Sequence, residues 1–221
     1  MVLRTLSALE ARVLGVLVEK SLTVPDSYPL SLNTLTLGCN QKTARDPVLN
    51  VTEAEVLMVV DALKSLHLVF ESSGSRVSRY EHNFGRVVGL PSQSVALLAA
   101  LMLRGPQTVS ELRINSERLH RFADLSAVEG FLDELATRTE EKGGPLVVKL
   151  ARQAGEREAR WAQLLCGAAG AAATALDTGA PDFVATSEIA ALKAQHAALQ
   201  TQVTELRALV DKLYVELGVA R

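Results

Sequence analysis

The stretch LVFESSGSRVSRYEHNF, residues 68–84, decides the fold, because the spacing of its apolar residues differs from that of the residues before it. Two extended runs containing valine and aromatic residues flank a Ser-Gly turn, which predicts a two-stranded antiparallel ribbon. The preceding residues instead repeat their apolar positions at helical spacing. The stretch therefore marks the point where a set of helices ends in a β-hairpin.

Three helices are expected before this ribbon. The first and third open on Ser or Thr followed three residues later by Glu, as in Ser7/Glu10 and Thr52/Glu55, which is the pattern of a capping box. A further helix is expected at residues 31–40, with Leu32, Leu35 and Cys39 facing inward. The core-facing positions of the first and third helices are Leu9, Val13, Val16 and Leu17, and Val56, Val59, Val60 and Leu63.

The second half of the chain repeats this order of elements. A helix is expected at residues 92–103, entered after Pro91, and two more follow capping-box patterns at Thr108/Glu111 and Ser126/Glu129. The last of them turns Val128, Phe131, Leu132 and Leu135 toward the core. The segment GGPLVVKLARQAGEREARWAQLL then predicts a second ribbon that turns around Gly155.

Three helices followed by a two-stranded ribbon describe a winged helix, a helix-turn-helix variant whose hairpin is the wing. We therefore predict a mainly α protein with small β wings, built as two tandem winged-helix domains at residues 1–88 and 89–166. The Ala/Gly-rich residues 167–186 resemble a flexible linker. Residues 187–221 are expected to form a coiled-coil helix.

The coiled coil is predicted from a heptad repeat, with leucine at every d position and mainly β-branched residues at a, which favours a parallel homodimer. Its seam consists of Ile189, Leu192, His196, Leu199, Val203, Leu206, Val210, Leu213 and Leu217. His196 is the polar a residue, so acidification toward about pH 5 should weaken the dimer by charging the seam. The alternative is one long helix that packs back on its own domains.

Composition limits the class of protein. The chain has 221 residues and is 48% apolar, which suits globular domains. Charges interrupt every apolar run near the N-terminus, so we expect no signal peptide, no membrane contact and a cytoplasmic location. Cys39 and Cys166 lie in apolar segments and are expected to be buried and inert.

No motif predicts a reaction, a metal or a cofactor. His67, His82, His120 and His196 do not stand at zinc-ligand spacing, and nucleotide-binding and serine-hydrolase loops are absent from the sequence. We therefore expect a protein that is not an enzyme and that carries no metal or cofactor.

Winged helices often bind DNA, but the charge pattern places any binding away from the recognition helices. Each expected third helix carries a net charge of −2, so phosphates would repel it. The candidate binding residues lie in connectors and in the first wing: Gln41, Lys42, Arg45, Arg76, Arg79, Arg113, Arg118 and Arg121. Four such cations on one face would give a salt dependence with a slope near −3.6, about 0.9 per phosphate.

The alternative is that these side chains have only structural roles and that their charges are neutralised by local ion pairs. Arg45 could pair with Asp46, and Arg113 with Glu117 at i,i+4. Asn40 could cap the preceding helix, and Gln41 could bond to the backbone of its own connector.

Five segments carry a resemblance to a known family: YPLSLN, CNQK, RDPV, LRGPQT and SERLHRF. Through them the chain strongly resembles the YceH-like, or UPF0502, family of uncharacterised bacterial proteins over roughly residues 5–166. The resemblance implies tandem winged-helix domains and brings no biochemical activity. One departure is LRINSERL, which has Ile114-Asn115 where the family usually has Arg-Thr.

The sequence therefore predicts a non-enzymatic protein that binds nucleic acid through its first connector and wing. The alternative is an adaptor that uses the same folds to hold another protein, without DNA contact. A contiguous basic face would favour DNA, and a large exposed apolar patch would favour a protein partner.

Overall fold

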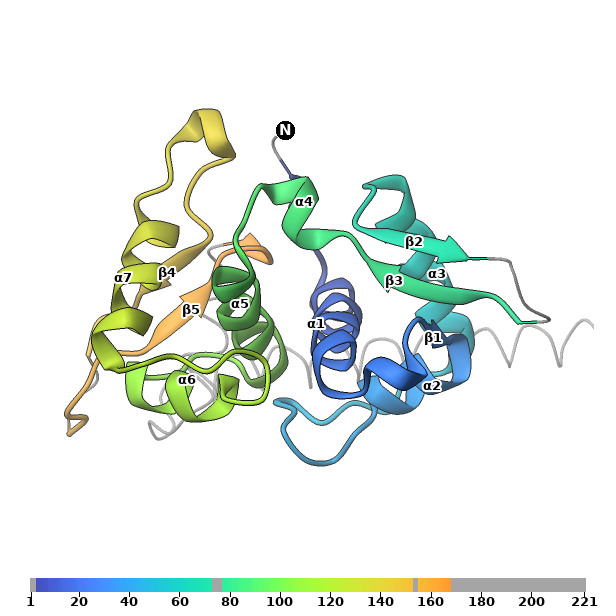
Figure 1. Cartoon of the computed structure of the whole chain (residues 1–221), viewed down its shortest axis with the longest axis horizontal. Coiled ribbons are helices and arrows are strands. Elements are labelled where there is room, and N and C mark those ends of the chain that lie inside the picture. The colour runs from blue at the N-terminus through green and yellow to red at the C-terminus, as the bar shows by residue number, and fades with distance from the viewer. Residues whose placement is uncertain (1–2, 73–76, 153–154, 168–221) are drawn as a thin grey trace, which may run out of the picture. The chain divides into compact units, whose positions relative to one another are not determined.

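The structure is a computed structural model that describes residues 3–72, 77–152 and 155–167. Within these residues the chain is mainly helical and has two small antiparallel sheets (Figure 1). The expected coiled coil and all but the first residue of the expected linker lie outside the described residues.

The first half contains the expected helices and ribbon. Its helices are α1 (Ala8–Thr23), α2 (Leu32–Cys39) and α3 (Glu53–Ser65), with the short 3-10 turn η1 (Pro25–Ser27) after α1. Its strands are β1 (Leu30–Ser31), β2 (Val69–Ser72) and β3 (Arg79–His82). The predicted ribbon of β2 and β3 is confirmed, and the two-residue β1 extends it to a sheet of order β1-β3-β2.

The second half repeats the order of helices and hairpin. After the short helix α4 (Phe84–Val88), its elements are α5 (Ser92–Arg104), α6 (Val109–Ser116), α7 (Leu125–Ala136), η2 (Glu140–Lys142), β4 (Val147–Lys149) and β5 (Trp161–Gln163). The predicted second ribbon is the antiparallel pair of β4 and β5. The sequence did not predict α4, which joins the two halves.

Three of the four predicted capping boxes are confirmed, at the starts of α1, α3 and α6. The fourth, Ser126/Glu129, is wrong, because α7 begins one residue before Ser126. Asp124 caps this helix instead, and its carboxylate accepts hydrogen bonds from Ala127 N at 2.8 Å and from Ser126 Oγ at 2.9 Å. An aspartate is as good an N-cap as a serine, and here its position sets the start of the helix.

The core is centred on α1 and α5, which lie side by side and bring the two halves together (Figure 1). The contact is close at Gly15, where an added Cβ would lie 3.0 Å from Leu103 Cγ. Backbone hydrogen bonds also link the halves, from Leu6 N to Leu165 O and from Asp46 N to Leu103 O, both at 2.8 Å. The expected core positions Val13, Val16, Leu17, Val56, Val60, Leu63, Val128, Leu132 and Leu135 are buried.

The two cysteines differ in exposure. Cys39 is buried as expected, and burial raises the pKa of its thiol to about 12. Cys166 is only partly buried, which corrects the expectation for this residue, although burial still raises the pKa of its thiol. Among the described residues, no helix has the length and apolar character needed to span a membrane.

Candidate functional site: the cleft between two connectors

Two loops that carry expected binding residues meet at one cleft. We define the first connector as residues 40–52, between α2 and α3, and the second connector as residues 117–124, between α6 and α7. The cleft has a volume of about 160 Å³ and is also bounded by the C-terminal ends of α1 and α5. Its charged and amide-bearing lining residues are Glu19, Lys20, Gln41, Arg104, Asn115 and Arg118.

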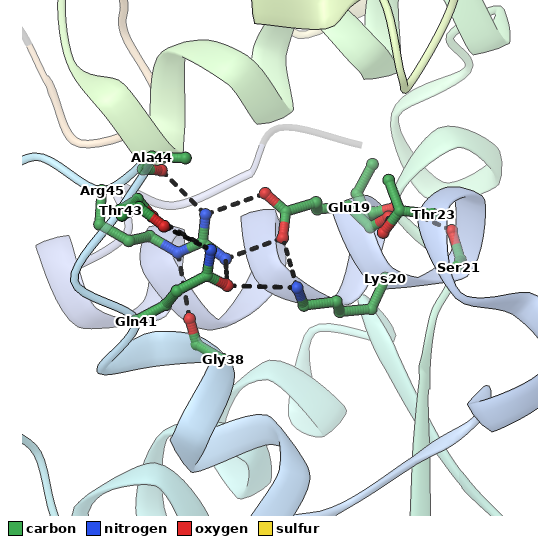
Figure 2. A network of polar contacts seen from close by, with 10 residues as sticks. Glu19, Lys20, Ser21, Thr23, Gly38, Gln41, Thr43, Ala44 and Arg45 are labelled. Carbon is green, nitrogen blue, oxygen red and sulfur yellow. Dashed lines mark hydrogen bonds and ion pairs between the residues drawn. The ribbon is translucent and has the colours of Figure 1, made fainter.

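Arg45 lies beneath this cleft and not on its surface, which contradicts its prediction as a surface cation. Its side chain has an exposed fraction of 0% and makes a two-pronged ion pair with Glu19, with N–O distances of 2.8 and 2.9 Å (Figure 2). Its Nε also donates to the carbonyl of Gly38 at 3.0 Å. The suggested local pair with Asp46 is therefore wrong as well, because the Arg45 side chain pairs with Glu19 of α1.

The charge of Glu19 is stabilised by its partners. Burial by itself would raise the pKa of this carboxyl, but hydrogen bonds from Arg45 and Lys20 outweigh burial and hold the pKa below its usual value. Lys20 Nζ lies 2.9 Å from Glu19 Oε1 and donates to Gln41 Oε1 at 3.3 Å. The network thus fixes the first connector to the last turns of α1.

A second buried arginine joins the end of α2 to the middle of the first connector. Arg12, which is 2% exposed, donates from its two terminal nitrogens to the carbonyl oxygens of Cys39 at 3.2 Å and Pro47 at 2.7 Å. Burial and the neighbouring charge of Arg45 lower the pKa of Arg12. Two guanidinium groups on backbone carbonyls therefore give the connector a defined shape.

Asn40 and Gln41 have the structural roles that were suggested as the alternative. Asn40 is the C-cap of α2, and its amide exchanges two 2.8 Å hydrogen bonds with the backbone of Val51. Gln41 donates to the carbonyl of Thr43 at 3.2 Å. Gln41 also lines the cleft, so its side chain both stabilises the first connector and borders the candidate site.

The open part of the cleft is cationic. Arg104, at the end of α5, and Arg118, in the second connector, have no hydrogen-bond or ion-pair partner for their side chains within the described residues. Lys20 is the third cation, and Glu19 is the only acid among the lining residues. Because Arg45 lies directly behind Glu19, the region carries an excess of positive charge.

The remaining expected residues do not line this cleft. Lys42 and Arg121 are exposed and have no side-chain partner in the described part of the chain, and each adjoins the cleft along its connector. Arg113 donates to the carbonyl of Ala123 at 3.4 Å, and the suggested ion pair with Glu117 is not formed. Arg79 of β3 donates to Pro29 O at 2.8 Å, and Arg76 lies outside the described residues.

The outer face of α3 differs in character from the cleft. It exposes Glu53, Asp61 and the apolar side chains of Leu57 and Met58, which are 39% and 67% exposed. The cation of this helix, Lys64, is paired with Asp61 at 3.3 Å and with Glu71 of β2. The face is therefore acidic and apolar.

Sequence reasoning missed two cations of the cleft, Lys20 and Arg104, as well as Glu19 and Asn115. Each of the two cations lies in the last turn of a helix, where a basic residue has an ordinary role in opposing the helix dipole, so neither marks a binding site in the sequence. Only the packing of α1 against α5 brings them beside both connectors. Among the described residues, no group of three histidine, cysteine or acidic side chains gathers to hold a metal ion.

Comparisons with known proteins identify close relatives. A family model described as "Protein of unknown function, DUF480" matches residues 6–156. The chain is 61% identical over 218 residues to a UPF0502 protein of Burkholderia multivorans, covering 98% of this chain and 91% of that protein. It is 59% identical over 219 residues to a UPF0502 protein of Leptothrix cholodnii, covering 98% and 97%. The names of these relatives state no ligand, partner or reaction.

Proposed function

The chain belongs to the UPF0502 family, and we propose that it is a non-enzymatic nucleic-acid-binding protein that holds the phosphate backbone in the cleft between its two connectors. In this proposal each half is a winged-helix domain, which the repeated order of three helices and a hairpin supports. The first connector keeps its expected role in binding phosphate. Arg45 is buried and supports the connector, while Arg104 and Arg118 supply the cations that contact the phosphate.

The observation that carries the proposal is the pair of unpartnered arginines in one cleft. Arg104 and Arg118 come from different elements, and neither side chain is neutralised within the described residues. A guanidinium group can donate two parallel hydrogen bonds to a phosphate. The cleft volume of about 160 Å³ is small beside the roughly 300–1,000 Å³ of small-molecule sites, so a group that projects from a longer ligand fits it better.

Binding of this kind would carry little sequence specificity. Contacts to phosphate fix position, while sequence is read from base edges. The acidic outer face of α3, with Glu53 and Asp61, would be repelled by a phosphate-lined major groove. The protein should therefore bind unrelated duplexes with similar affinity.

Fluorescence anisotropy with labelled duplexes at about 50 mM salt tests the proposal, because phosphate contacts are strong at low salt. Replacing both Arg104 and Arg118 by Ala should weaken binding about ten- to a hundredfold, and by a similar factor for each duplex. The control is the double variant Arg86→Ala/Lys142→Ala, which removes the same charge at the other end of α5 and should bind like the wild type. Equal affinity of the wild type and the cleft variant would refute the proposed site.

One observation favours a second candidate function, an adaptor that binds another protein. Leu57 and Met58 expose apolar surface on α3, and such surface is typical of protein contacts when it forms a patch. If the wild type binds no duplex even at about 50 mM salt, the adaptor becomes the better account. If it binds, replacing Leu57 and Met58 by Ala should leave the affinity for DNA unchanged.

A further inference from the structure

A separate cavity lies at the opposite end of α5 from the connector cleft. It has a volume of about 530 Å³ and is lined by the loop between α4 and α5, the first turn of α5, and the loop after α7. Ser94 in this cavity and Arg104 in the cleft are ten residues apart on one helix, a rise of about 15 Å. The two sites therefore involve different side chains and can be tested independently.

The cavity is lined by an excess of cations. Arg86, Arg138 and Lys142 face one acid, Glu134. The side chains of Arg86 and Lys142 have no hydrogen-bond or ion-pair partner in the described part of the chain. Arg138 donates to the carbonyl oxygens of Val88, at 3.1 Å, and of Lys142, while its Nε is buried and has no partner among the described residues.

Ser94 provides a second and independent sign of a ligand. The residue is only 1% exposed and lines the cavity, yet its hydroxyl makes no hydrogen bond within the described residues. The fully enclosed, unpartnered polar atom beside this cavity is Arg138 Nε, whereas the Ser94 hydroxyl borders the open space and can bond to what occupies it.

The start of α5 adds further free donors. Pro91 is its N-cap and supplies no side-chain hydrogen bond to the first turn. Val95 N donates to Pro91 O at 3.1 Å, but the backbone N–H groups of Ser92, Gln93 and Ser94 have no acceptor within the described residues and are free to bind an anion. Ser94 stands in the same turn, so its hydroxyl and these amides lie at the same place in the fold.

We propose that this cavity binds a small organic phosphate, with the phosphate group at the start of α5. Ser94 and the free amides donate to the phosphate oxygens, and Arg86 and Lys142 balance the charge. The apolar side chains of Leu90, Pro91 and Leu135 contact the organic part of the ligand. The volume is in the range of small-molecule sites, roughly 300–1,000 Å³, and is larger than a lone phosphate requires.

Isothermal titration calorimetry of the full chain tests this site with phenyl phosphate, ribose 5-phosphate and inorganic phosphate. At least one organic phosphate should bind about tenfold or more tightly than inorganic phosphate, because only it also contacts the apolar wall. Both Ser94→Ala and Arg86→Ala/Lys142→Ala should weaken this binding about tenfold or more. The variant Arg104→Ala/Arg118→Ala, with the same loss of charge, should bind the organic phosphate like the wild type.

Three results would overturn the inference. The first is no binding of either organic phosphate at millimolar concentration. The second is an affinity no higher than that of inorganic phosphate, which would mean that only an anion is held. The third is loss of binding in the Arg104/Arg118 variant but not in the Arg86/Lys142 variant, which would assign the phosphate to the connector cleft. Because the DNA measurement uses the same two variants in opposite roles, failure of one proposal is distinguishable from failure of the other.

Discussion

Arg45 shows what a single residue's sequence context can and cannot reveal. Its polar neighbours in the loop predicted a surface cation, yet the side chain is buried against Glu19, which precedes it by 26 residues. No local sequence pattern predicts this ion pair, because it forms only when the first connector folds back on α1. The roles of Asn40 and Gln41 could be anticipated, since their bonds begin from a helix end and a short loop.

The ion pair between Arg45 and Glu19 predicts a pH-dependent stability. The pKa of Glu19 is lower in the folded chain than the roughly 4.3 of a free glutamate, so its stabilising effect is complete above that value. It is lost as the pH falls through the folded pKa. Urea unfolding should show Glu19→Gln to be less stable than the wild type by roughly 1.5–3 kcal/mol at neutral pH. The difference should shrink on acidification below about pH 4.3.

The control for this measurement is Glu129→Gln, which changes an exposed carboxylate of α7. Its stability relative to the wild type should vary little over the same pH range. A Glu19→Gln difference that stays constant or grows with acidification would contradict the assigned role of the ion pair.

At the scale of elements, the sequence predicts most of what local chemistry determines. Capping boxes place the starts of α1, α3 and α6 because the cap and its partner are three residues apart. The start of α7 was missed because Asp124 competes with Ser126 for the same role. Strand β1 could not be predicted, since two residues become a strand only by pairing with β3.

Packing between elements predicts opposite effects at two helical glycines. At Gly38 of α2 an added Cβ would lie 2.6 Å from Val16 Cγ1 of α1, whereas at Gly130 of α7 nothing lies within 4 Å. Gly38→Ala should therefore destabilise the fold by about 1–3 kcal/mol through overpacking. Gly130→Ala should stabilise it by about 0.5–1 kcal/mol, because alanine restricts the unfolded chain and favours a helix. Urea unfolding compares the two variants, and an unchanged or increased stability of Gly38→Ala would show that the close contact between α1 and α2 does not limit stability.

At the scale of the whole molecule, the connector cleft arises from contacts that join the two halves. Gln41 and Arg118 were each predicted as binding residues in separate loops, but their meeting depends on α1 lying against α5. Lys20 and Arg104 also line the cleft only because α1 packs against α5. The predicted dimer seam from Ile189 to Leu217 lies outside the described residues and stays a prediction. Sedimentation of the full chain is the measurement that addresses it.

The salt dependence of DNA binding tests the central claim most directly, because its slope counts phosphate contacts. Affinity for one labelled duplex is measured across a series of salt concentrations for the wild type, for Arg104→Ala/Arg118→Ala and for Arg86→Ala/Lys142→Ala. Each lost phosphate contact should make the slope of log affinity against log salt shallower by about 0.9, so the cleft variant should differ from the wild type by about 1.8. The Arg86/Lys142 variant should keep the wild-type slope. Identical slopes for the wild type and the cleft variant would contradict the account, as would an equal change of slope in both double variants.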